Sequence, residues 1–131
     1  MYDLHSIKEI CEQLRLPCRL ATPFEIEISL YPDVVFVFAN LESENDTYLG
    51  FRDTPWHSHG NLMLMTGDST YLEYEPAELL TAISKGDVVI ATQSNGEQMQ
   101  DRWLTHKDEN LDLKYLGPGE TLSVFRIAAR L

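Results

Sequence analysis

The chain has 131 residues and little of several features that would assign a protein quickly to a class. It contains two cysteines, seven glycines and six prolines, too few for a disulfide scaffold, a collagen-like repeat or a linker-rich chain. Its longest apolar run, residues 34–39, is far too short to cross a bilayer as a helix. No basic region followed by an apolar stretch opens the sequence, so neither a secretory signal nor a membrane span is expected.

Basic residues are scarce as well. Ten Lys and Arg stand against 21 Asp and Glu, which gives a net charge of −11 and a sequence pI near 4.6. Such a surface repels phosphate backbones, so direct nucleic-acid contact is not expected. It attracts a basic protein partner, although the same excess of acid also serves solubility alone. Charge by itself does not decide between these two interpretations.

The two cysteines favour a reducing compartment, and we expect a cytoplasmic protein. Cys11 falls on the apolar stripe of a predicted helix, where a thiol behaves as a small hydrophobic group. The spacing of seven between Cys11 and Cys18 matches no zinc or redox pair.

The composition is that of an ordinary globular protein, with 44% hydrophobic and 24% charged residues. The length predicts a single domain over residues 1–131. Apolar residues at spacings of three and four predict an N-terminal helix over residues 3–14. A second helix is predicted to begin at Pro76 and to end before Gly86, because proline suits the first helical turn and glycine suits the position after the last.

Strand patterns fill most of the remaining sequence. Residues 24–30 alternate between apolar and polar, whereas residues 34–39 are continuously apolar, as in a strand covered on both faces. Further strands are predicted at residues 48–52, 62–65, 70–74, 88–93, 97–105, 111–116 and 121–128. Turn residues join most of them as hairpins. The sequence therefore predicts an α+β fold with a largely antiparallel sheet of about seven or eight strands, packed with the two helices.

Residues 52–60 hold the densest group of side chains with binding chemistry. The candidates for binding are Arg52, Asp53, Trp56, His57 and His59. In an extended backbone His57 and His59 point to one face, so together they are candidate ligands for zinc or another transition metal. Such a site needs a further ligand, for example Asp53 or His106. The alternative is structural: Trp56 packs the loop onto the sheet and both histidines lie at a solvated edge.

Other chemistries have less support in the sequence. Ser58 lacks the strand-turn-helix setting of a nucleophile elbow, and a buried Cys11 is expected to be inert. No glycine-rich phosphate loop leads from a strand into a helix. We therefore expect no cofactor, assign no catalytic residue, and regard enzymatic activity as not indicated.

Amphipathic aromatic rings are plentiful and are the kind enriched at protein interfaces. They are Tyr48, Trp56, Tyr71, Tyr74, Trp103 and Tyr115. Met63, Met65 and Met99 are interpreted first as core residues. Our leading hypothesis is a small acidic protein-binding module, for example an immunity or antitoxin-like inhibitor of a basic partner. The second is a metal-binding protein or small metal-dependent enzyme that uses His57 and His59, and the third is a homo-oligomer assembled through an open sheet edge.

Overall fold

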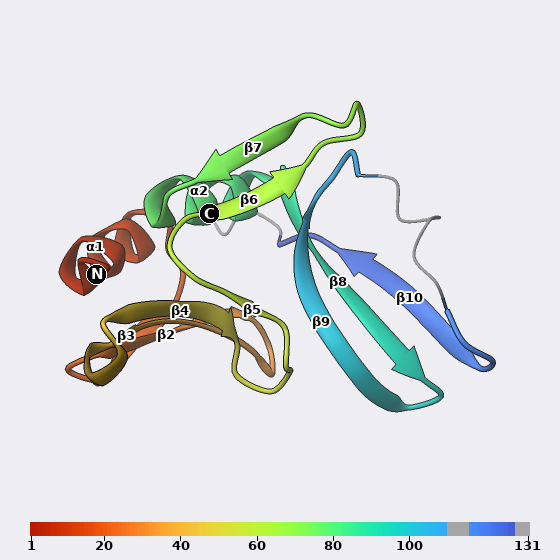
Figure 1. Ribbon diagram of the computed structural model, residues 1–131, viewed down its shortest axis with the longest axis horizontal. Coiled ribbons are helices and arrows are strands. Elements are labelled where there is room, and N and C mark those ends of the chain that lie inside the picture. The colour runs from red at the N-terminus through yellow and green to blue at the C-terminus, as the bar shows by residue number, and fades with distance from the viewer. Residues whose placement is uncertain (110–115, 128–131) are drawn as a thin grey trace.

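The computed structural model describes residues 1–109 and 116–127, and Figure 1 shows their arrangement. These residues form two α-helices and ten strands, and the strands pair antiparallel in three sheets. Helix α1 spans Leu4–Gln13 and helix α2 spans Pro76–Lys85. The predicted α+β class, the antiparallel pairing and both helices are thus confirmed.

The first sheet has the order β1-β2-β3-β4-β5, so each strand pairs with its neighbour in the sequence. Its strands are β1 (Cys18–Thr22), β2 (Glu25–Tyr31), β3 (Val34–Leu41), β4 (Asp46–Phe51) and β5 (His57–Ser58). A short 3-10 turn, η1 (Glu42–Glu44), connects β3 to β4. Strand β3 is the most apolar, and the continuous run that predicted it is almost entirely buried.

The two other sheets are smaller. Strands β6 (Leu62–Met65) and β7 (Tyr71–Tyr74) form a hairpin. Strands β8 (Val88–Asn95), β9 (Gln98–His106) and β10 (Glu120–Phe125) form a sheet in the order β10-β8-β9. Of the strand predicted at 111–116, residues 111–115 lie outside the described residues.

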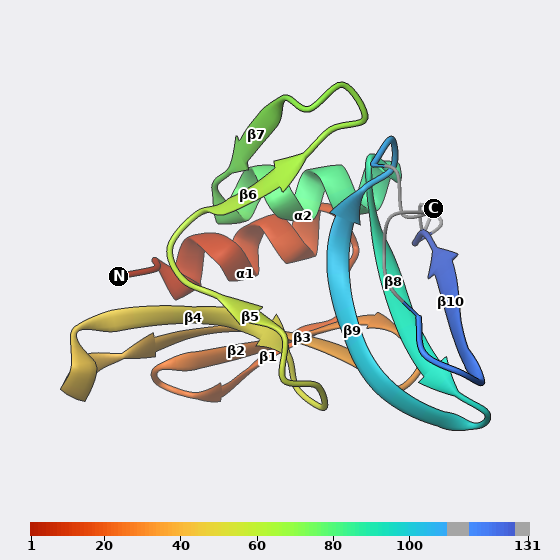
Figure 2. The same cartoon turned by 45° about the vertical axis from the view of Figure 1, so that its right-hand side comes forward.

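The two helices pack between these sheets. Figure 2 shows α1 lying over the first sheet, with α2 beside it and under the β6–β7 hairpin. The carboxylate of Asp3 accepts the Ser6 backbone N–H at 3.1 Å and so caps α1. Helix α2 has Pro76 in its first turn and ends at Gly86, whose φ of +80° is the left-handed conformation that glycine adopts without strain.

One cluster of buried apolar side chains connects the helices and all three sheets. Fully buried members include Cys11 of α1, Phe36 and Phe38 of β3, Leu80 of α2 and Ile90 of β8. Phe36 also makes edge contacts with Phe38 and Phe51, with ring centroids 5.3 and 5.1 Å away. Because every layer contributes to this cluster, the three sheets are held at fixed positions around it.

The division into three sheets has a local cause. Strand β5 has two residues, and the chain leaves the first sheet at Gly60, whose φ is +66°. Strand β1 and strand β5 were not predicted, because the first lacks strict alternation and the second is too short to show a pattern. Eight of the segments predicted as strands, together with these two short strands, make up the ten strands of the described residues.

Candidate binding surface

Arg52 lies just after β4 and reaches back across the first sheet to β2. Its Nη2 atom is 2.7 Å from Oε2 of Glu27 and also contacts the carboxylate of Glu25. Arg19 binds the other oxygen of Glu27 from β1. Partial burial raises the pKa of Glu27. The hydrogen bonds from Arg52 and Arg19 lower it by more, so the pKa stays below its usual value. Arg52 therefore belongs to an ion-pair network on the sheet.

Asp53 is also engaged in an ion pair. Both of its carboxylate oxygens are 3.3 Å from Nη1 of Arg102 on β9. The Arg102 side chain is only 12% exposed and lies 5.8 Å from the ring centroid of Phe51. This pair ties the β4–β5 loop of the first sheet to the edge of the β8–β9–β10 sheet. Among the five predicted residues, Arg52 and Asp53 are thus directed away from the two histidines.

Trp56 and the two histidines do lie together. Trp56 is half-buried and packs against the core, with its ring centroid 6.0 Å from that of Phe51. The rings of His57 and His59 are 5.2 Å apart and nearly perpendicular, so both side chains share one face, as their alternation predicts.

Gly50 explains how this arrangement forms. It is the cross-strand partner of His57, and a Cβ atom here would lie 2.8 Å from both the Trp56 carbonyl and the Tyr48 hydroxyl. Without a side chain at this position, the loop closes over β4 and the Tyr48 ring stacks on His57 at 5.3 Å. A larger residue would push Trp56 and His57 out of place.

Both histidines are oriented by backbone carbonyls. Nδ1 of His57 is 2.9 Å from the Pro55 oxygen, and Nδ1 of His59 contacts the Thr47 oxygen. A carbonyl only accepts, so in the neutral form of each ring the proton lies on Nδ1 and the lone pair on Nε2. This is the tautomer that an imidazole needs to bind a metal through Nε2.

A third metal ligand is not supplied nearby within the described residues. They contain no group of three or more His, Cys, Asp and Glu side chains placed to hold one ion. Asp53 is paired with Arg102, and Nδ1 of the buried His106 accepts the Asp108 backbone N–H at 3.1 Å. Asp46 approaches His59, but on the Nδ1 side at 3.4 Å.

The histidine segment borders a groove of about 380 Å³ where the three sheets meet. It runs between β5, β6 and β9, each the last strand on one side of its own sheet. The lining residues are Trp56, His57, Ser58, Leu62, Met63, Leu64, Met65, Tyr71, Trp103, Leu104 and Glu109. Most of the lining residues are apolar or aromatic, but polar atoms make up about half of the exposed lining, which holds one carboxylate and no lysine or arginine among the described residues.

Met63 was missed as a surface residue, whereas Tyr71 was among the aromatic residues of the kind found at interfaces. Met63 is 56% and Tyr71 57% exposed, so the interpretation of Met63 as a core residue is wrong. The sequence pattern of β6 could have predicted the exposure of Met63, because neighbouring strand residues face opposite sides and the two leucines are the buried ones. Leu62 and Leu64 are the buried members, and Met65 is half-buried.

Half of the eight Lys and Arg side chains among the described residues are paired with neighbouring acids. Arg19, Arg52, Arg102 and Lys107 each form an ion pair, the last with Asp87 at 3.0 Å. Exposed carboxylates meanwhile lie at Glu42, Glu44 and Asp46, the last of them 3.4 Å from Nδ1 of His59, and at Asp68 and Glu73 on the β6–β7 hairpin. At the groove itself, Glu109 is part of the lining and Glu73 is the register partner of the lining residue Met63.

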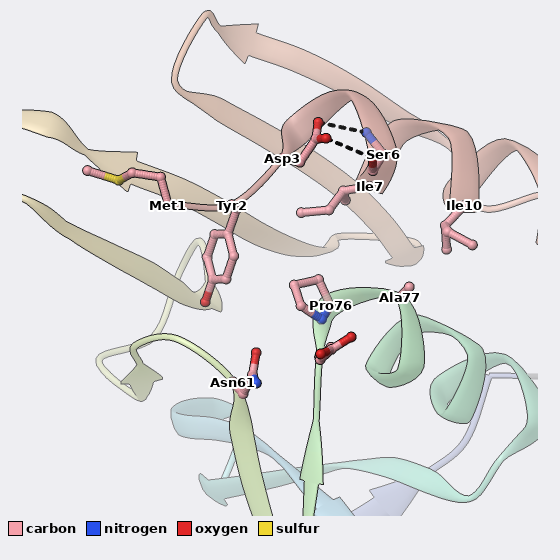
Figure 3. A pocket seen from close by; sticks show the side chains of 10 residues that line it. Met1, Tyr2, Asp3, Ser6, Ile7, Ile10, Asn61, Pro76 and Ala77 are labelled. Carbon is pink, nitrogen blue, oxygen red and sulfur yellow. Dashed lines mark hydrogen bonds between the residues drawn. The ribbon is translucent and has the colours of Figure 1, made fainter.

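A second cavity, of about 280 Å³, lies where the two helices begin (Figure 3). Its two carboxylates serve the helix starts: Asp3 bonds to Ser6 of α1, and Glu75 is the N-cap of α2, where it forms a capping box with Glu78. Tyr2 closes one side, with its backbone N–H on the Asn40 side chain and its hydroxyl on the Gly60 carbonyl. These polar groups hold the N-terminal segment against the sheet, which is a structural role.

The two cysteines come closer than their spacing suggested. Cys11 is fully buried on α1 and Cys18 is half-buried at the start of β1, and both are free thiols. Burial and the neighbouring Cys18 thiol raise the pKa of Cys11 to about 12. Cys11 is therefore an unreactive core thiol, as predicted, whereas Cys18 is the accessible one.

Comparison with known proteins gives no match: no family model, no curated protein and no solved structure is similar to this chain. Among the described residues, no helix is long and apolar enough to cross a membrane. The features of this protein that point to a function are therefore the groove, its charge and its exposed side chains.

Proposed function

We propose that this protein is an acidic binding module that holds a basic partner protein over the groove between β5, β6 and β9. The observation that carries the proposal is an exposed apolar centre, Met63 and Tyr71, placed beside a groove lined by Trp56 and Trp103. Methionine and aromatic residues surrounded by polar ones are typical of contact surfaces between proteins.

Charge supports the choice of a basic partner. The net charge of −11 attracts cationic proteins over long range, and Glu109 and Glu73 place carboxylates at the groove. An inhibitor of the immunity or antitoxin type, which covers a basic protein, fits these properties. A reducing compartment such as the cytoplasm fits the two free thiols.

A matched pair of variants tests this function. Met63→Asp places a charge in the apolar centre, whereas Phe24→Asp places one at a similarly exposed residue between β1 and β2, across the first sheet from β5. Native mass spectrometry of the untagged proteins, isolated gently from their own host, should show a basic partner at fixed stoichiometry with wild type and Phe24→Asp. Met63→Asp should lose it, and the association rate should fall as salt is raised to about 0.5 M. A partner kept by Met63→Asp, or an association rate unaffected by salt, would contradict the proposal.

The tautomers of His57 and His59 favour a second candidate function, the binding of a transition metal. Each Nδ1 is held by a carbonyl and each Nε2 is left for a ligand. Titration with Zn²⁺ should then give a stoichiometric site that disappears in His57→Ala/His59→Ala and is unchanged in His5→Ala, which alters an exposed histidine on α1. Binding that is equally strong in the double variant would exclude this pair as the ligands.

A further inference from the structure

The hydrogen-bonding phase of the β6–β7 hairpin shows which backbone groups point into the groove. The Thr66 N–H donates to the Thr70 carbonyl at 2.7 Å, and this pair continues the register of the two strands. In an antiparallel ladder, bonded and non-bonded pairs alternate. Leu62 and Leu64 therefore bond to β7, whereas the N–H and C=O groups of Met63 and Met65 point away from β7, toward the groove.

Strand β9 shows the same arrangement on the other side of the groove. The Lys107 N–H donates to the Asp87 carbonyl at 2.9 Å, so Leu104 turns its backbone groups away from β8. The carbonyls of Arg102 and His106 also point away from β8, but both already accept a hydrogen bond. The Thr54 hydroxyl donates to Arg102, and the Glu109 N–H donates to His106. Within the described part of the chain, no other residue bonds to the backbone of Met63, Met65 or Leu104.

Strand β6 is short, with four residues, but it lacks the other features that protect edge strands. Natural edges are shielded by lysine, proline, an inward charge or a bulge. Strand β6 reads Leu-Met-Leu-Met and pairs with β7 without a register shift. Such an edge either causes aggregation or accepts a further strand.

We propose that the groove takes an extended, lysine- or arginine-rich segment of the partner as an added strand on the free edge of β6. This inference rests on the proposed function and specifies its mode of recognition. The outward groups of Met63 and Met65 would supply main-chain hydrogen bonds. The charge follows from Glu73, the register partner of Met63, and from Glu109 in the lining, with no cation among the described lining residues to oppose them.

The test uses a soluble peptide that alternates lysine with valine, and the same peptide with N-methyl groups on the lysines, which lie opposite Met63 and Met65 when the strand adds antiparallel with its lysines on the Glu73 face. Both peptides carry identical charge, but the methylated one cannot donate those main-chain bonds. We expect hydrogen exchange at the Met63 and Met65 amides to slow when the first peptide binds, while the Tyr71 and Glu73 amides on the outer edge of β7 stay unchanged. The methylated peptide should bind at least roughly ten-fold more weakly, a difference of about 1.4 kcal/mol.

Proline variants test the same edge from the protein side. Met65→Pro removes an outward N–H without touching the ladder to β7, and Glu73→Pro does the same on the opposite edge of the hairpin. Met65→Pro should weaken the peptide and Glu73→Pro should not, and the exchange of Leu62 and Leu64 amides reports whether either hairpin is still folded. Equal binding of both peptides, with protection absent from β6, would overturn strand addition while leaving an acidic binding surface intact. No binding of either peptide would overturn strand addition, and the native-host measurement would still decide the proposed function.

Discussion

At the scale of single residues, small features determine what the surface presents. Gly50 lets Tyr48 stack on His57, and two carbonyls fix the tautomers of His57 and His59. The sequence identified the histidines but not their support, because glycine in a strand has several explanations and carbonyl contacts leave no trace in residue type. It also placed Arg52 and Asp53 in the same cluster, whereas their ion-pair partners are distant in the sequence.

The two cysteines provide a test at this scale. With its pKa raised to about 12 by burial and by the neighbouring Cys18 thiol, Cys11 stays protonated near pH 8, and the thiolate is the reactive form. We expect a thiol reagent to modify one cysteine per folded chain near pH 8 and two in denaturant. Cys18→Ser should abolish the reaction of the folded chain. A folded Cys18→Ser protein that still reacts at the rate of wild type would show that Cys11 is accessible.

At the scale of elements, the sequence predicted a helix or hairpin most accurately where particular residues mark its ends or its turn. Helix α2 carries proline at its start and glycine after its end, and its predicted limits match those observed. The β6–β7 hairpin was likewise predicted from its turn residues. How this hairpin lies relative to β5 and β9 was not predictable, because long-range packing around the shared core sets that position. The groove is a product of this packing.

The turn of the hairpin allows two substitutions with opposite effects. A Cβ atom at Gly67 would lie 2.3 Å from the Asp108 carbonyl oxygen, so Gly67→Ala should push the turn off its neighbouring loop and destabilise the protein by about 1–3 kcal/mol. Ser69 has a φ of +67°, and Ser69→Gly should relieve about 1 kcal/mol of strain. Urea unfolding of the two variants and wild type measures both changes. Equal midpoints for all three would show that the turn does not contact residue 108 in solution.

At the scale of the whole molecule, the acid excess and the shared core act in opposite directions. The core connects both helices and all three sheets, which favours cooperative unfolding of a single domain. The net charge of −11 produces self-repulsion in the folded state, which salt screens.

We therefore expect one thermal transition whose midpoint rises by roughly 3 °C when salt is raised to about 0.5 M. Calorimetry at two salt concentrations measures this change, and sucrose of matched osmolality controls for general exclusion from the surface. A lower midpoint in salt would mean that the ion pairs of Arg52 and Arg102 contribute more than the repulsion. Two separate transitions would mean that the sheets unfold independently.

The order of strands in the first sheet also has a consequence for how the protein forms. From β1 to β5, each strand pairs with the one made just before it, so only short loops must close. This sheet can begin to assemble on the ribosome while the later strands are still being synthesised. Ile127, which joins the core after β10, completes the structure last. During that interval the apolar face that the last strands cover is open, and the acidic surface already present keeps neighbouring nascent chains apart.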